Sequence, residues 1–178
     1  MSDKKTPHAR GIDTEAIRAA ARNVDDGAVT AGYPPERKEI IALLNAALAT
    51  ELVCVLRYTR HYFTVSGLIN RPIKAEFLKH AQEEQDHADL LADRIIQLNG
   101  EPDFNPATLM DRSHAEYDDS RSINAMIRAN LIAERVAIEA YRQMITTIGE
   151  DDPTTRQMLV GIMAKEEEHA EEMRDLLA

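Results

Sequence analysis

The sequence has a single cysteine, no tryptophan, and only seven glycines and seven prolines among its 178 residues. One cysteine excludes an intrachain disulfide and a zinc site made of cysteine pairs. The shortage of glycine and proline, with no stretch of alternating polar and apolar residues, argues against a β-sheet. We expect no membrane span, because no apolar run is expected to reach the length of one, and the polar N-terminus is unlike a signal peptide. A cytoplasmic protein is therefore expected.

The residues that are abundant favour helix, namely Ala, Leu, Ile, Glu, Arg and Met. The length suits one domain with a sizeable core. A net charge of −10 disfavours a general nucleic-acid surface, so DNA is not an expected partner. Lys4, Lys5 and Arg10 make the N-terminus faintly basic, which leaves DNA protection as a minority alternative.

Proline and glycine positions divide the chain into helical segments. Residues 1–33 are predicted to form an N-terminal extension with a short helix at 14–23, capped by Asp13. Residues 34–178 are predicted to form one helical domain. A further short helix is expected at 107–112. The four long helices are expected at residues 34–67, 72–99, 120–148 and 153–178.

The connections between these helices indicate a topology. The first two helices share a short connection, as do the last two, so each pair is predicted to be an antiparallel hairpin. The middle connection has about 20 residues and can span roughly 66 Å, whereas a helix of about 28 residues is roughly 42 Å long. The predicted fold class is thus all-α, a four-helix bundle of two hairpins joined by a long crossover.

One pattern of four residues occurs twice in this chain. Each copy has a glutamate, a tyrosine seven residues later, and then a Glu-x-x-His step. The two glutamates of a copy are separated by 33 residues in the first and 32 in the second. The first copy is Glu51, Tyr58, Glu84 and His87, and the second is Glu134, Tyr141, Glu166 and His169.

The glutamates of this pattern stand at matching depths in the predicted hairpins, on apolar helix stripes. Glu134, for example, has Ile127, Leu131 and Ile138 at helical spacings of −7, −3 and +4. A lone glutamate on a helix is usually solvated, but four buried together as bare anions would carry a large energetic cost. Two divalent cations would neutralise them, so the pattern predicts a site for two metal ions.

With these motifs, the chain resembles the ferritin-like superfamily, and within it bacterioferritin and the Dps-like proteins that carry a bacterioferritin-type diiron site. The resemblance implies that Glu51 and His87 serve one iron and that Glu134 and His169 serve the other. Glu84 and Glu166 would bridge the two irons. Tyr58 stands where bacterioferritin also has a tyrosine, and both Tyr58 and Tyr141 are expected to orient ligands or supply an electron, the alternative being core tyrosines with satisfied hydroxyls.

Departures from the family pattern restrict the resemblance. Gln85 stands where bacterioferritin has its haem-ligating methionine, so no haem is expected. The chain ends nine residues after His169 without a fifth helix, which favours a twelve-subunit shell, with a dimer or a 24-mer left open. Ala137 stands where rubrerythrin has an extra glutamate, and the cysteine pair of the Dps-like relatives is absent.

The resemblance implies a ferroxidase that binds two Fe(II) per chain and oxidises them with O2 or H2O2, for iron storage and oxidative-stress protection. Carboxylate and imidazole ligands also suit manganese. One alternative is a peroxide-reducing enzyme of the rubrerythrin or manganese-catalase type, and another is a structural metal-binding or DNA-protecting protein. Glu83 is a candidate acceptor for a histidine N–H, whereas its counterpart is Lys165, so unequal halves are expected. His80, one turn before Glu84, is expected to be exposed, the alternative being a residue that supports a ligand or binds iron on its entry path.

Overall fold

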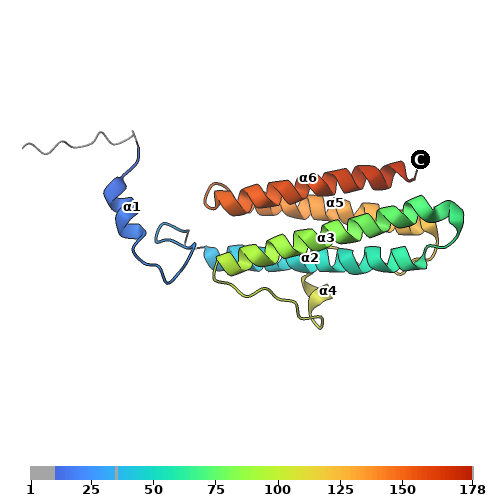
Figure 1. The fold of residues 1–178 in the computed structure, drawn as a ribbon, viewed down its shortest axis with the longest axis horizontal. Helices are drawn as coiled ribbons and strands as arrows, with labels where there is room; N and C mark the ends of the chain where they lie inside the picture. The colour runs from blue at the N-terminus through green and yellow to red at the C-terminus, as the bar shows by residue number, and fades with distance from the viewer. Residues whose placement is uncertain (1–10, 35, 178) are drawn as a thin grey trace, which may run out of the picture.

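The computed structural model describes residues 11–34 and 36–177, and within that part of the chain it contains helices and no strand. The basic residues Lys4, Lys5 and Arg10 lie outside the described residues. Four long helices lie side by side (Figure 1), which confirms the predicted all-α bundle. They are α2 (Arg37–Thr64), α3 (Arg71–Gln97), α5 (Ile123–Ile148) and α6 (Pro153–Asp175).

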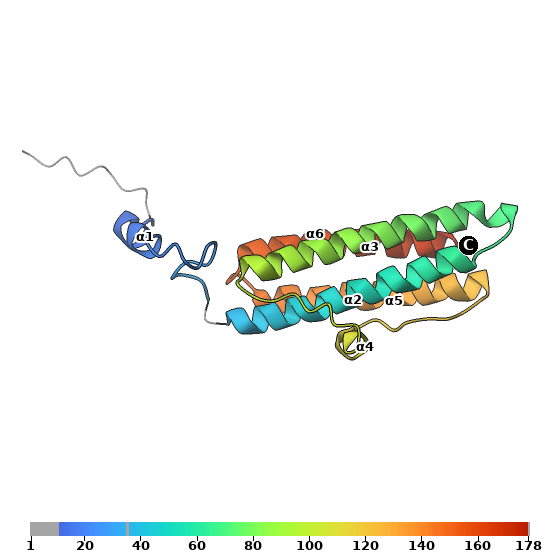
Figure 2. The ribbon, with the colours of Figure 1, turned by 60° about the horizontal axis from the view of Figure 1, so that its bottom comes forward.

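The topology is the predicted one of two hairpins and a crossover. Helix α2 packs mainly against α3, and α5 packs mainly against α6, while α2 also contacts α5 and α3 contacts α6. The crossover runs beside α2 and carries the short helix α4 (Leu109–Arg112) (Figure 2). The buried Arg57 of α2 fastens it by donating from Nη1 to the Glu116 carbonyl at 3.2 Å.

Side chains fix where several helices begin. The Asp13 carboxylate accepts from the backbone N–H groups of the first turn of α1 (Thr14–Ala20), as predicted. Ser122 and Asp152 cap α5 and α6 in the same way. Helix α5 therefore begins after Ser122, later than the sequence suggested.

Helix α2 ends at Thr64, three residues before the predicted stop. Val65 is already extended, with φ −64° and ψ 128°. Gly67 then turns the chain at φ 91°, a conformation that favours glycine. The 3₁₀ helix η1 (Leu68–Asn70) follows and leads directly into α3.

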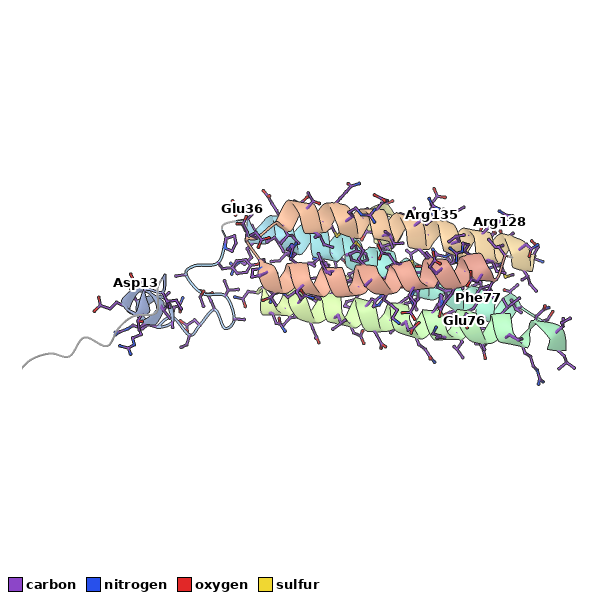
Figure 3. The ribbon with its side chains drawn as sticks, turned by 90° about the horizontal axis from the view of Figure 1, so that it is seen from above. Asp13, Glu36, Glu76, Phe77, Arg128 and Arg135 are labelled. Carbon is purple, nitrogen blue, oxygen red and sulfur yellow. The ribbon has the colours of Figure 1, made fainter. Side chains whose placement is uncertain are left out.

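The bundle core has two apolar layers with a polar centre between them. One layer gathers around Leu44, Leu91 and Leu159, and the other around Phe77 and Met126, all of them fully buried. Many charged residues lie on the opposite faces of the helices, and Figure 3 labels Arg128 and Arg135 on the exposed side of α5. The apolar layers exclude water from the centre and so strengthen electrostatic interactions there.

Helix α2 is, in the described part of the chain, the one helix long and apolar enough to cross a membrane by length and composition alone. The prediction from sequence that no apolar run is long enough to span a membrane was therefore wrong for α2. Half of its most apolar window is buried in the bundle. Glu51 and Arg57 on this helix are also buried. The apolar side chains of α2 therefore serve to pack it against the neighbouring helices of the bundle.

The N-terminal segment meets the bundle at one end. Helix α1 has no buried residue and lies away from the four long helices (Figure 1). The Tyr33 hydroxyl donates to the Asp152 carboxylate, which Arg94 holds through a buried ion pair at 2.9 Å. This contact fastens the end of the segment to the tip of the α5–α6 hairpin.

Candidate metal centre

The structure brings the six carboxylate and imidazole residues of the repeated pattern together at the centre of the bundle. Each long helix contributes its predicted member or members, and every glutamate among them is at most 1% exposed. The histidines are 7% and 0% exposed. These residues are Glu51 from α2, Glu84 and His87 from α3, Glu134 from α5, and Glu166 and His169 from α6.

The six residues divide into two groups of four whose ligand atoms all lie within 4.8 Å of one another. Glu51 and His87 belong to the first group only, and Glu134 and His169 to the second group only. Glu84 and Glu166 belong to both, as the resemblance implied for bridging carboxylates. Metal binding by these residues stays a prediction.

The two oxygens of each shared carboxylate face different imidazoles. Glu84 places Oε2 3.5 Å from His87 Nδ1 and Oε1 3.6 Å from His169 Nδ1. Glu166 places Oε1 2.8 Å from His87 Nδ1 and Oε2 3.6 Å from His169 Nδ1. Each of these carboxylates can therefore bind one cation through each oxygen.

The atoms that face this centre lack hydrogen-bond partners among the described residues. Even the 2.8 Å approach of Glu166 to His87 lacks hydrogen-bond geometry. Buried polar atoms are almost always satisfied, so such a convergent set indicates a bound group. The carboxylates carry a formal charge of −4, which two divalent cations balance. The unpartnered atoms are Oε2 of Glu51 and Glu134, both oxygens of Glu84 and Glu166, and Nδ1 of His87 and His169.

The two tyrosines of the pattern hold the unshared glutamates from across the bundle. Tyr58 on α2 donates its hydroxyl hydrogen to Oε1 of Glu134 on α5, and Tyr141 on α5 donates to Oε1 of Glu51 on α2. In each glutamate the other oxygen is left facing the centre. Both tyrosines are buried with satisfied hydroxyls and also orient a predicted ligand, so the two interpretations of the sequence coincide.

The electrostatics of the centre reflect crowded buried carboxylates. Burial, followed by repulsion from Glu166 and Glu84, raises the pKa of Glu51 well above its usual value. Burial and repulsion from Glu84 and Glu166 likewise raise the pKa of Glu134. Burial acts in the same direction on Glu84, but its contacts with the two imidazoles outweigh it and lower the pKa of this carboxyl.

The two histidines respond to the same carboxylates. Burial alone would lower the pKa of His87, but Glu166, Glu51 and Glu84 raise it to about 12. For His169 the carboxylates of Glu166 and Glu84 overcome burial and raise the pKa to about 11. In the metal-free protein both imidazoles are therefore expected to be doubly protonated and positively charged at neutral pH. Cations that bind here must displace those protons.

The two halves of the centre differ in how their imidazoles are held. Nε2 of His169 lies 2.9 Å from Oε2 of Glu83, and its ring is fully buried. Nε2 of His87 has no hydrogen-bond partner among residues 11–34 and 36–177. The counterpart Lys165 instead lies 3.7 Å from Glu83 and 2.6 Å from Glu168. The unequal halves expected from Glu83 and Lys165 are present in the geometry.

We therefore expect the metal position at Glu134 and His169 to fill before the one at Glu51 and His87. An oriented imidazole typically improves metal affinity by about 10-fold or more. Crystals soaked in substoichiometric Co²⁺ should show several-fold higher anomalous density at the His169 position. A Glu83→Ala variant should reduce that difference. Equal density at both positions in the unsubstituted protein would contradict the prediction.

The prediction that His80 is exposed was wrong. This side chain is fully buried. Its Nδ1 lies 3.0 Å from the Tyr58 hydroxyl and its Nε2 lies 2.7 Å from Oε2 of Glu172. The signal was its position four residues before Glu84, which places both on one helix face.

Arg57 is a buried charged residue near the centre that the sequence did not single out. It is fully buried and donates from Nε to Oδ1 of Asn130 at 2.9 Å and from Nη2 to Sγ of Cys54 at 3.3 Å. Cys54 lies against Ala115 and Ala133 as a small core residue. Nothing in the spacing of Arg57 distinguishes it from a solvated arginine, because its oxygen partners, Asn130 and Glu116, come from α5 and the crossover.

These features define a class of protein, a four-helix bundle whose centre carries two carboxylate and histidine groups able to hold metal ions. The family model for the ferritin-like domain matches residues 41–178. The chain belongs to this ferritin-like family.

Known relatives lie on two branches of that family. A "nutrient stress-induced DNA-binding protein" from Synechococcus is 30% identical over 138 residues, covering 76% of this chain and 78% of the relative. A bacterioferritin from Desulfovibrio desulfuricans is 26% identical over 141 residues, covering 78% and 75%. Among solved structures, a dodecameric thioferritin described as the bacterioferritin-related protein from Bacteroides fragilis is 34% identical, with a TM-score of 0.75, over 79% of this chain and 85% of that one.

Proposed function

We propose that this protein is a ferroxidase that binds two Fe(II) ions and oxidises them with O2 or H2O2, with iron storage and protection from oxidative damage as its roles. The observation that carries this proposal is the pair of carboxylates, Glu84 and Glu166, whose two oxygens face different imidazoles. They can hold two cations side by side, which suits a two-electron oxidation. The bacterioferritin relative supports the same class of activity.

The residues of the centre divide the work in this proposal. Glu84 and Glu166 would contact both irons, while Glu51 with His87 and Glu134 with His169 would complete one position each. Tyr58 and Tyr141 hold the unshared glutamates through their hydroxyl groups. Carboxylate oxygens stabilise the ferric product, and mixed carboxylate and imidazole ligands suit iron or manganese. No residue is proposed to bind haem.

A homo-oligomer is the proposed assembly, with twelve subunits favoured because the Bacteroides fragilis relative is described as dodecameric. Exposed apolar side chains support burial against other copies. Phe63, Leu68 and Ile69, around the α2–α3 connection, are 74%, 75% and 88% exposed. Such a concentration of exposed apolar residues commonly marks an interface. A cytoplasmic location stays a prediction.

The proposal is tested by loading the protein with Fe²⁺ without oxygen and then adding oxidant. Ferric absorbance and particle mass by light scattering are followed together. We expect rapid oxidation of two Fe per chain in a large particle, continuing as more iron is added. Oxidation that stops at two Fe per chain in a dimer would instead support a peroxide-reducing enzyme. An absence of oxidation would contradict the ferroxidase and favour manganese or a structural metal.

DNA binding is a second candidate function, favoured by the name of the Synechococcus relative. The relatives thus bear against the sequence-based expectation that DNA is not a partner. The overall charge of −10 opposes it, and Lys4, Lys5 and Arg10 are the basic residues that this candidate function would use to contact phosphates. A gel mobility shift that is lost when these three are replaced by glutamine would support this function. No shift at low salt would count against it.

A further inference from the structure

A cluster of three residues on the face shared by α3 and α6 has no part in the centre described above. It consists of Glu76 and His80 from α3 and Glu172 from α6, and is called here the His80 cluster. One ligand atom from each lies within 4.8 Å of the others. Figure 3, where Glu76 is labelled, shows α3 and α6 side by side.

The His80 cluster has an imidazole at its base and carboxylates at its rim. Nε2 of His80 lies 2.7 Å from Oε2 of Glu172 and 3.4 Å from Oε1 of Glu76. The imidazole is fully buried, whereas the two carboxylates are about 30% exposed. These separations match those around His87, where Nδ1 lies 2.8 to 3.5 Å from three carboxylates.

Hydrogen-bond directions show what the buried imidazole presents to the rim. Tyr58 donates its one hydroxyl hydrogen to Glu134, so its oxygen can only accept from Nδ1 of His80 at 3.0 Å. This places the hydrogen of a neutral imidazole on Nδ1 and the lone pair on Nε2. Nε2 nevertheless lies 2.7 Å from Oε2 of Glu172, a hydrogen-bond distance, so in the metal-free protein a second hydrogen lies between these two atoms and a bound cation would take its place. A cation is the group that such a set accepts.

A cation of this chain already occupies the mouth of the cluster. Nζ of Lys79 lies 2.7 and 3.0 Å from the Glu172 oxygens and 3.1 Å from Oε1 of Glu76. The side chain of Lys79 is 41% exposed and flexible, so it can move into solvent at small cost. Lys79 thus marks a position attractive to positive charge and competes for it.

The His80 cluster adjoins the dinuclear centre directly. The His80 ring stacks on that of His169 with centroids 4.1 Å apart, and Tyr58 joins His80 to Glu134. Both contacts reach residues of the metal position formed by Glu134 and His169. At the equivalent place beside Tyr141 the chain has the buried aliphatic residue Ile162, four residues before Glu166. Among the described residues, the position four before the shared glutamate is therefore polar on α3 and apolar on α6.

We propose that Glu76, His80 and Glu172 form a third divalent-cation site, on the outside of the dinuclear centre, that takes Fe²⁺ or a similar ion before it moves inward. Two carboxylates and an imidazole suit Fe²⁺, Mn²⁺, Co²⁺ and Zn²⁺. The loading role rests on the proposed ferroxidase function, whereas the existence of a third bound ion does not.

The site is tested by titrating the intact metal-free protein with Co²⁺, using calorimetry for the ion count and visible absorbance for the ligand environment. We expect three ions per chain, two bound tightly and one weakly. Glu172→Gln should lose the weak ion and keep the tight pair. The matched control Glu171→Gln removes the same charge one residue away, from a 63% exposed side chain paired with Arg174, and should keep all three.

Lys79→Gln is the decisive variant. If the His80 cluster only held α3 and α6 together and bound no metal, removing the lysine would not strengthen the binding of any ion. We expect the weak ion to bind up to about fivefold more tightly, the upper range for an exposed ion pair. Two tight ions and no third in both the unsubstituted protein and Lys79→Gln would overturn the third site alone. Failure to bind even two ions would overturn the dinuclear proposal as well.

The loading role has its own measurement in the oxidation assay. Glu172→Gln should raise the iron concentration needed for half-maximal rate about fivefold and leave the maximal rate unchanged, because the dinuclear centre is intact. Glu171→Gln should leave both unchanged. If Glu172→Gln alters neither parameter although it loses the third ion, the site does not load the centre.

Discussion

Replacement of Glu84 by alanine is expected to abolish rapid iron oxidation, with a loss of at least about 100-fold in initial rate. Loss of a residue that merely supports a ligand already costs about 10- to 100-fold, and Glu84 is positioned to touch both irons. The variant should also bind fewer than two Fe²⁺ per chain. The measurement is ferric absorbance after oxidant is added to protein loaded without oxygen.

Two further variants make this result interpretable. Glu84→Gln keeps the shape of the buried side chain and removes its charge, so an equal loss of rate would trace the effect to the ligand rather than to a cavity. Gln85→Ala is the matched control, since Gln85 points away from the centre and donates its amide hydrogen to Asp89 at 2.8 Å. Iron oxidation at an unchanged rate in both Glu84 variants would remove the enzyme proposals altogether.

The second large effect is expected on stability when metal is removed. Each divalent cation present at 100 times its dissociation constant adds about 2.7 kcal/mol to the free energy of unfolding. Two sites therefore correspond to a rise of about 10 °C or more in the melting temperature of a protein of this size. Thermal melts in chelator and in Co²⁺ or Mn²⁺ measure it. Mg²⁺, which retains its waters and prefers oxygen ligands, should give a much smaller rise.

The pH dependence of the metal-free protein follows from the groups in the centre. His87 and His169 have raised pKa values, so their contribution to stability is complete below their usual value of 6.5 and is lost as the pH rises toward about 11 to 12. The pKa values of Glu51 and Glu134 are also raised, so their contribution to stability likewise decreases as the pH rises above their usual pKa of 4.5. Glu84 is lowered, so its contribution is present above 4.5 and lost in acid.

Metal-free protein is accordingly expected to be most stable near pH 5 to 6 and to weaken as the solution becomes alkaline. Each proton held only in the folded state changes the free energy of unfolding by about 1.4 kcal/mol per pH unit. We expect a loss of at least about 1 kcal/mol per pH unit between pH 7 and 9. The metal-loaded protein should show no such loss, because cations replace the protons. Parallel pH profiles for the two forms would contradict this account.

Particular residues show how far the sequence determined the site and the fold. The apolar stripes around Glu51, Glu84, Glu134 and Glu166 determine which face of each helix turns inward, because helical periodicity is local. The matched depths then place these glutamates at one level, and the histidines follow one turn later. The ferritin-like bundle, its two hairpins and the crossover were all predictable from spacing and connection lengths.

Only the tertiary structure decided the contacts between helices. Tyr58 reaches Glu134 on another helix, and Tyr141 reaches Glu51 in the reverse sense. Periodicity gives the direction of a side chain from its own helix, but not the lateral offset or the rotation of its neighbour.

The same reason explains why the burial of His80 and the raised pKa values of His87 and His169 could not be predicted from the sequence. Burial of His80 depends on the approach of α6, which brings Glu172 within 2.7 Å, and nothing in the local sequence of α3 specifies that approach. The sequence by itself therefore determined which residues meet at the centre of the bundle. The packing of four helices decided which oxygen faces which imidazole, because that depends on distances of a few ångströms between segments far apart in the chain.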